Sequence, residues 1–148
     1  MDTTDGVSVS DHHSQYRAGF RVDGSSGDRD SYTFSGEMSY LDEGISNTIP
    51  NFNPPSFSGV ENLDEEDRGF HILSRWNRDL ESGSKLSLLT YYDRQKRDLE
   101  NVGVFTVNTI ETDLQYGGRL TEDIDFISGL QWRLIDDDID FYNHIIFD

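Results

Sequence analysis

Strict alternation of side-chain character over residues 69–93 is the feature that most constrains how this chain folds. In residues 70–77 and 86–93, apolar side chains alternate with more polar ones, and the segment 81–84 (ESGS) between them has the composition of a turn. Because successive side chains of a strand point to opposite faces, each run has an apolar side and a wetter side. Gly83 can adopt the positive φ that tight hairpin turns require. The segment therefore predicts an antiparallel β-hairpin.

The same alternation recurs along the chain. It predicts further strands at residues 14–23, 31–41, 107–117 and 125–133, and residues 140–148 have the pattern of the start of another. Each run is bounded by turn-forming residues. The pattern predicts an all-β, antiparallel up-and-down meander of about six to eight strands.

The predicted connections alternate in length. Short turns are predicted at 24–30 and 118–123, in addition to the one at 81–84. The segment 42–67 contains all three prolines and ends in an acidic run, so it predicts a long loop, and 94–103 predicts a medium one. The aspartates at 136–138 predict a further loop. Short turns at one end and long loops at the other are typical of outer-membrane barrels.

Composition excludes several classes of protein. The chain has 29 acidic residues against 12 basic ones, a net charge of −17, whereas nucleic-acid phosphates need clustered Lys and Arg, so we expect no nucleic-acid partner. It has no cysteine, which excludes disulfides and thiolate chemistry. With a mean hydropathy of −0.66, no stretch approaches the roughly 20 apolar residues of a membrane helix. A membrane strand needs only about 9–11 residues, of which alternate ones face lipid.

The two sides of the predicted strands differ in chemistry. One side carries mostly aromatic and aliphatic residues, including aromatic residues near strand ends that are placed as a membrane girdle would be: Trp76, Tyr92, Tyr116 and Trp132. The other side collects polar residues, which would face a lumen: Arg17, Arg21, Glu37, Arg75, Glu111, Asp113, Gln115 and Arg133. We expect Arg75 and Arg133 to pair with Glu37, Glu111 or Asp113. A polar interior beneath an apolar exterior predicts a section of a transmembrane β-barrel, whereas the alternative is that the rings form the core of a soluble β-sandwich.

Several short motifs, taken in order, resemble the barrel hairpins of TonB-dependent outer-membrane receptors. The central hairpin carries RW at 75–76, SKLSL at 84–88 and YYD at 91–93. Similar hairpins flank it, with GFRVD at 19–23, DRDSYT at 28–33 and Gly36 before it, and TDLQY at 112–116 and GLQWR at 129–133 after it. The resemblance covers residues 16–133, which is most of the chain.

This resemblance implies an internal piece of a receptor barrel in the outer membrane of a Gram-negative bacterium. Family members take up iron–siderophore complexes, cobalamin and related solutes, with a signal peptide, a plug domain and a barrel of about 22 strands. The sequence shows neither plug nor signal peptide, so we expect it not to transport alone. The implied partners are outer-membrane lipid and lipopolysaccharide, a ferric siderophore or similar solute, and the TonB–ExbB–ExbD complex, which would act through the plug of the complete receptor. Candidate ligand-binding residues in the two predicted loops are Asn51, Phe52, Asn53, Phe57, Arg94, Lys96 and Arg97.

Other chemistry has little support in the sequence. The carboxylates lie mostly in predicted loops, and no serine lies in a nucleophile elbow, so we expect no enzyme and no cofactor. The acidic runs 64–67 and 136–138 have the oxygen ligands that calcium prefers but not the spacing of a calcium loop. The adjacent residues His12 and His13 point opposite ways in an extended chain, so they chelate a metal ion poorly. We therefore expect no metal site. The alternative function is a soluble, secreted β-rich binding module.

Overall fold

The chain folds into one antiparallel sheet of six strands, described here from a computed structural model. The structure describes residues 12–50 and 58–142, with the side chains of 47–50 and 58–62 left out of the description. The strands are β1 (His13–Ser26), β2 (Asp30–Pro50), β3 (Ser58–Asp79), β4 (Lys85–Leu99), β5 (Gly103–Thr121) and β6 (Ile124–Phe141). They lie side by side in chain order, each antiparallel to the next. The prediction of an all-β antiparallel meander is therefore confirmed.

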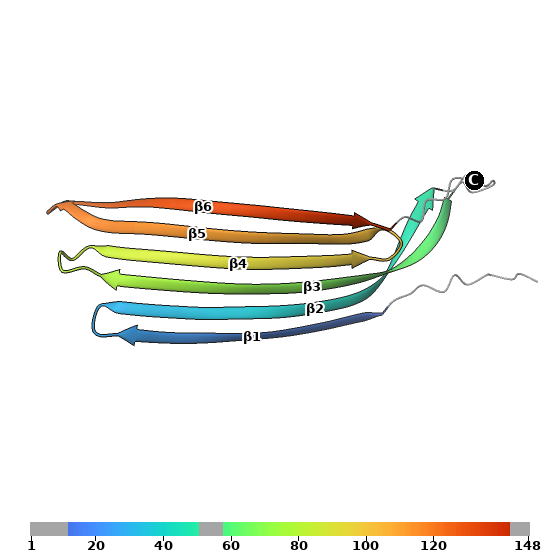
Figure 1. Ribbon diagram of the computed structural model, residues 1–148, viewed down its shortest axis with the longest axis horizontal. Coiled ribbons are helices and arrows are strands. Elements are labelled where there is room, and N and C mark those ends of the chain that lie inside the picture. The colour runs from blue at the N-terminus through green and yellow to red at the C-terminus, as the bar shows by residue number, and fades with distance from the viewer. Residues whose placement is uncertain (1–11, 51–57, 143–148) are drawn as a thin grey trace, which may run out of the picture.

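The strands form a single layer that is open at both edges (Figure 1). Strands β1 and β6 each pair with one neighbour only, so the described sheet does not close into a barrel. The turns β1–β2, β3–β4 and β5–β6 lie together at one end, which we name the turn end (Figure 1). The β4–β5 connection lies at the opposite end, and β2 and β3 extend beyond it together. No helix in the described part of the chain is long and apolar enough to cross a membrane.

Backbone geometry explains where the strands reverse. Gly83 in the β3–β4 turn has a φ of 79°, and Gly27 in the β1–β2 turn has a φ of 62°, values that residues with a Cβ rarely adopt. The β3–β4 turn closes through a hydrogen bond of 2.8 Å from the Leu80 amide to the Ser84 carbonyl. At the opposite end Asn101 also has positive φ, which asparagine tolerates better than most residues. The predicted turn at 81–84 is confirmed.

The predicted loops at 42–67, 94–103 and 136–138 are wrong over the residues that the structure describes, and 51–57 lie outside them. Residues 42–50 of β2 pair with 58–66 of β3 in continuous register, from Asp42 opposite Glu66 to Pro50 opposite Ser58. Residues 94–99 belong to β4 and the β4–β5 connection spans only 100–102, while the aspartates at 136–138 lie inside β6. The reason is that sheet hydrogen bonds are made by the backbone, so a strand continues through polar sequence when its neighbour also continues. The predicted strand at 140–148 ends as β6 at Phe141, and residues 143–148 lie outside the described residues.

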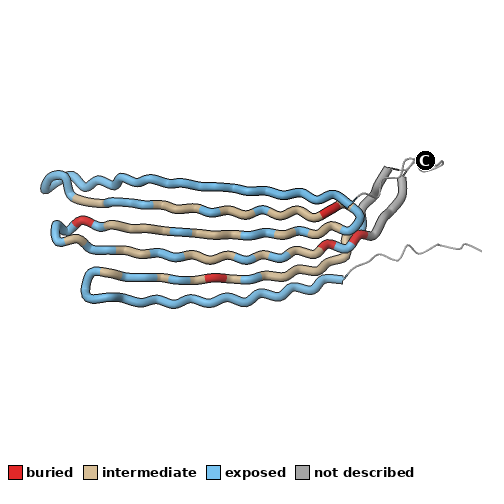
Figure 2. The backbone as a smooth tube through the Cα atoms, viewed as in Figure 1, coloured by how far each residue is buried: buried red, intermediate tan, exposed pale blue. Residues whose placement is uncertain are grey.

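A single sheet encloses no core. Leu63, 6% exposed, is the one buried apolar residue in the described part of the chain. Strands β1 and β6 are exposed along their length, whereas the four inner strands are partly covered by their neighbours (Figure 2). One close approach is notable, because a Cβ on Gly36 would lie 2.8 Å from the Phe20 ring. Glycine at this position lets that ring lie flat across β2.

Candidate functional site

The two faces of the sheet are the candidate site, because the register assigns every side chain to one of them. In all five pairings, partners directly opposite one another are both even-numbered or both odd-numbered, except for Thr121 opposite Ile124 at the end of β5. Opposed residues of neighbouring strands point to the same side of a sheet. We therefore name them the even face and the odd face. The only register shift lies between Arg119 and Thr121, at the end of β5.

The even face is apolar over the central part of every strand. We define the central part as 16–22 of β1, 32–40 of β2, 70–76 of β3, 86–92 of β4, 110–116 of β5 and 126–134 of β6. Its even-numbered residues are nearly all aromatic, aliphatic or small. Many are exposed, with Phe20 at 50% and Leu130 at 73%. Rings from neighbouring strands pack on one another, as Phe20 does on Phe34 with 5.4 Å between ring centroids.

The four aromatic residues predicted near strand ends all lie on the even face. Trp76 and Tyr116 lie toward the turn end, where the Trp76 indole donates a 2.8 Å hydrogen bond to Asp30 and the Tyr116 hydroxyl donates one of 3.0 Å to Ser84. Tyr92 and Trp132 lie toward the other end of the central part, and the Tyr92 hydroxyl donates to Asn108 at 3.2 Å. Three of the four rings thus keep a polar atom bonded while their bodies lie on apolar surface.

The eight residues predicted for the polar side all lie on the odd face, as their numbering and the register require. Two ion pairs cross between strands, Arg17 to Glu37 at 3.2 Å and Arg133 to Glu111 at 2.7 Å. The second includes Gln131, which donates to the same carboxylate at 2.7 Å.

The remaining polar-side residues make shorter-range contacts. Arg21 pairs with Asp23 on its own strand at 2.8 Å, and Gln115 donates to Asp113 at 3.0 Å. Arg75 forms no ion pair in the described structure, so the expected pairing holds for Arg133 but not for Arg75. It borders an open hollow of about 320 Å³ on the odd face, lined by Arg75, Asn77, Ser87, Leu89, Asp113 and Gln115. His71 lies on this face too, with its ring 5.9 Å from that of Tyr91.

The candidate ligand-binding residues do not lie together in a loop. Asn51, Phe52, Asn53 and Phe57 fall outside the described residues. The other three lie on β4, and strand alternation separates them between the two faces. Arg97 lies on the odd face, where it pairs with Glu65 at 2.9 Å and Asp67 at 3.0 Å. Arg94 and Lys96 lie on the even face.

Beyond the central part the even face becomes charged, and the odd face becomes mixed, with apolar residues beside charged residues such as Glu65, Asp67 and Arg97. We define the distal part as 41–46 of β2, 63–68 of β3, 94–99 of β4, 103–108 of β5 and 135–141 of β6. Its even face is charged and mainly acidic, with Asp42, Asp64, Glu66, Arg68, Arg94, Lys96, Asp98, Asp136, Asp138 and Asp140. Its odd face carries the apolar residues Leu41, Ile45, Leu63, Leu99, Phe105, Val107, Ile135, Ile139 and Phe141. The sequence reasoning missed this change because it predicted loops at 42–67, 94–103 and 136–138.

An acidic hollow of about 520 Å³ lies at the start of the β2–β3 extension. It is lined by Asp42, Asp64, Glu65, Glu66, Asp98, Glu100, Asn101 and Tyr142. Burial raises the pKa of Glu65 above its ordinary value, with Arg97 opposing that shift. The Tyr142 hydroxyl donates a 2.9 Å hydrogen bond to Asp98, which raises the pKa of the tyrosine.

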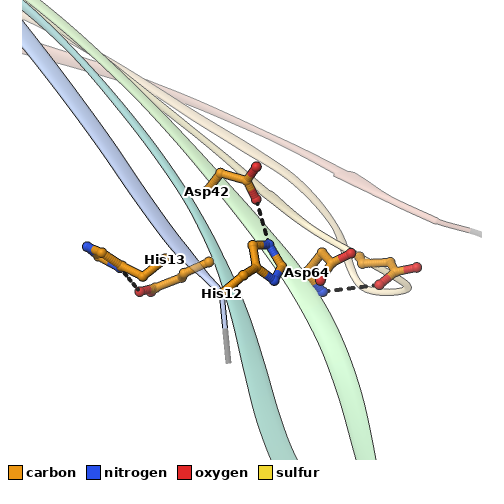
Figure 3. A network of polar contacts seen from close by, with 6 residues as sticks. His12, His13, Asp42 and Asp64 are labelled. Atoms are coloured by element: carbon orange, nitrogen blue, oxygen red, sulfur yellow. Dashed lines mark hydrogen bonds and ion pairs between the residues drawn. The ribbon is translucent and has the colours of Figure 1, made fainter. Parts of the chain in front are cut away.

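The adjacent histidines beside this hollow contact two adjacent carboxylates of β2, one on each face of the sheet (Figure 3). His12 lies 3.1 Å from Asp42 on the even face, and His13 lies 3.3 Å from Glu43 on the odd face. The prediction that the two rings point opposite ways is confirmed. Among the described residues, no group of three or more potential ligands is arranged to hold a metal ion.

Comparison with known proteins adds no identification. No protein-family model, no curated protein and no solved structure matches this chain.

Proposed function

We propose that this chain forms part of the barrel wall of an outer-membrane receptor for TonB-dependent uptake of an iron–siderophore complex or a similar solute. The observation that carries the proposal is the chemistry of the central part. Its even face is apolar and no second layer of the described structure covers it, and its odd face is polar and linked by ion pairs. A wall between lipid and a wet lumen needs this arrangement, whereas a soluble protein needs the apolar face covered.

The dimensions of the central part suit a membrane. The central part spans nine residues on β2 (32–40) and β6 (126–134), at the lower end of the roughly 9–11 residues that a tilted strand needs to cross the hydrocarbon, and seven on each of the other four strands. Aromatic residues stand at both limits, with Tyr32 and Trp76 toward the turn end and Tyr40 and Tyr92 toward the distal part. Two aromatic girdles around an apolar band are typical of outer-membrane strands.

The distal limit of the apolar band runs obliquely across the sheet. Following pairing partners from Tyr16 on β1 leads to Asp138 on β6. The last apolar residue before the aspartates on that side of β6 is Leu134, four positions earlier. The limit of the apolar band therefore shifts by about four residues across five strand pairings. At about 3.4 Å per residue and 4.8 Å per strand, the limit is inclined by about 30° to the direction perpendicular to the strands. Strands of membrane barrels tilt by about 35–45°, so a flat lipid boundary accounts for this oblique line.

The parts of the transport function divide between this chain and a complete receptor. Outer-membrane lipid and lipopolysaccharide would contact the even face, and the solute would pass along the odd face. The TonB–ExbB–ExbD complex would act on the plug of the complete receptor, so the chain alone is inactive in transport. The sheet's two unpaired edges would continue into further strands of that barrel, because exposed edges otherwise pair with other chains and aggregate.

The natural tryptophans offer a direct test of the lipid-facing assignment. Trp76 and Trp132 are the only two tryptophans, and both lie on the even face at opposite limits of the band. After refolding into phosphatidylcholine vesicles, we expect their fluorescence to be quenched by lipids brominated on the acyl chain and protected from aqueous acrylamide. Single variants W76F and W132F assign each signal to one residue.

The same measurement separates the alternative. A soluble, secreted β-rich binding module would remain monodisperse in buffer, and its tryptophans would not be quenched by brominated lipid. That result would overturn the outer-membrane proposal.

A further inference from the structure

Two cations on the even face lack the acidic partner that the chain gives nearly all its other cations. All 12 Lys and Arg residues lie in the described part of the chain. Ion pairs hold Arg17, Arg21, Arg29, Arg68, Arg78, Lys85, Arg97, Arg119 and Arg133. Among the side chains that the structure describes, no carboxylate forms an ion pair with Arg75, Arg94 or Lys96. With 29 carboxylates in the sequence, an unpaired cation is not explained by a shortage of partners.

Arg94 and Lys96 occupy adjacent even-face positions of β4. In the register, Lys96 lies directly opposite Arg68 of β3, and Arg94 lies opposite Phe70. Like charges directly opposed across two strands destabilise a sheet unless an anion lies between them. Arg68 itself is held by Glu66, and its guanidinium lies 6.0 Å from the Tyr40 ring.

The nearby carboxylates are engaged elsewhere. Glu66 and Asp98 line a small hollow together with Arg68 and Lys96. Glu66 pairs with Arg68, and Asp98 accepts the hydrogen bond from Tyr142. Neither carboxylate forms an ion pair with Lys96, so its positive charge remains available to an external anion.

The location of the two cations identifies the anion. Both follow Tyr92 on β4, with Arg94 level with Phe70 and Lys96 one even-face position beyond it, where the apolar band of the even face ends. Resting on the function proposed above, this is the level at which the phosphates of outer-leaflet lipid lie. Side chains on the even face point away from the odd face, so a solute in the lumen does not reach them.

We propose that Arg94 and Lys96, with Arg68 beside them, bind the phosphate of an outer-leaflet lipopolysaccharide. The two unpaired cations supply the charge, and the aromatic rings at the band limit hold the acyl region beside it. Cations at a membrane surface each strengthen attraction to anionic lipid by about fivefold, so the two together supply about 30-fold.

The test compares binding of the full chain to phosphatidylcholine vesicles with and without lipopolysaccharide. We expect wild type to prefer lipopolysaccharide vesicles and the double variant R94Q/K96Q to lose most of that roughly 30-fold preference. The matched control R75Q/K85Q removes the same charge from the odd face, and we expect it to retain the preference. Circular dichroism of each variant checks that the β-sheet is intact.

The outcomes separately test the location of the site, the nature of the anion and the proposed outer-membrane function. If R94Q/K96Q keeps the preference, or if both double variants lose it equally, the site is not there. If excess inorganic phosphate abolishes the preference, the residues bind free phosphate and the assignment to lipid is overturned. If neither wild type nor any variant inserts into plain phosphatidylcholine vesicles, the proposed outer-membrane function is contradicted.

Discussion

The central and distal parts of this sheet use the same strands with opposite chemistry. In the central part, Leu114 and Leu130 are exposed on the even face, and Glu111 and Arg133 pair on the odd face. In the distal part of β6, Asp136, Asp138 and Asp140 occupy the even face, and the odd face carries Ile135, Ile139 and Phe141 together with Asp137. The hydrogen-bonded register between the strands does not change at the boundary.

The difference shows that strand pairing does not dictate whether apolar or charged residues occupy a face. The backbone supplies the pairing in both parts, so side chains are free to match their surroundings. Under the proposed function, the even face passes from lipid into water at the boundary, and carboxylates replace leucines there. The odd face of the distal part then becomes the sheltered one, which accounts for its apolar residues.

The largest expected effect comes from placing a charge on each face of the central part in turn. L114R puts a charge on the lipid side, where arginine costs about 2–4 kcal/mol at mid-membrane. Q115R, one residue later, puts it on the polar side, and we expect a change within about 0.5 kcal/mol. Urea unfolding of each variant in vesicles measures the difference. Equal losses would show that the faces are not distinguished by lipid.

A smaller loss of unfolding free energy is expected from a substitution at the limit of the apolar band toward the turn end. W76F removes the hydrogen bond that the indole donates to Asp30 at 2.8 Å, and we expect a loss of about 1–2 kcal/mol, because the acceptor is charged. W132F is the matched control, since the structure gives the Trp132 nitrogen no hydrogen-bond partner. Unfolding free energies in the same vesicles should separate the two variants, and a comparable loss from W132F would refute the role of the bond.

The smallest effect concerns the pH response of the distal part. Burial raises the pKa of Glu65 in the folded chain above its unfolded value, so the fold favours the protonated carboxyl. This contribution is complete below the unfolded pKa and is lost as pH rises through the folded pKa. Amide hydrogen exchange in 42–46 and 63–67, corrected for intrinsic rate, should therefore slow as pH falls through that range.

The variant E65Q removes the titrating group while keeping its shape. We expect it to show slow exchange in the distal part already at neutral pH and a weaker response to acid. The central part, whose amides are compared in the same experiment, should not respond to this substitution. Unchanged pH dependence in E65Q would assign the effect to the other distal carboxylates.

The sequence by itself determined the strand positions near 14–23, 31–41, 70–77 and 86–93, and which residues share a face. The reason is local: side chains alternate with a period of two, so parity alone places Trp76 on one face and Arg75 on the other. It also placed the turn at Gly83, because few residues adopt that φ.

Only the tertiary structure decided how far each strand continues and which charges meet. Residues 42–50 contain and are followed by prolines and acidic residues, which favour a turn or a loop. They nevertheless pair with 58–66, because a neighbouring strand satisfies their backbone hydrogen-bonding groups. Likewise, Arg97 has two carboxylates and Lys96 has none, although the two are adjacent in sequence. Register between strands settles such partnerships, and register depends on residues far apart in the chain.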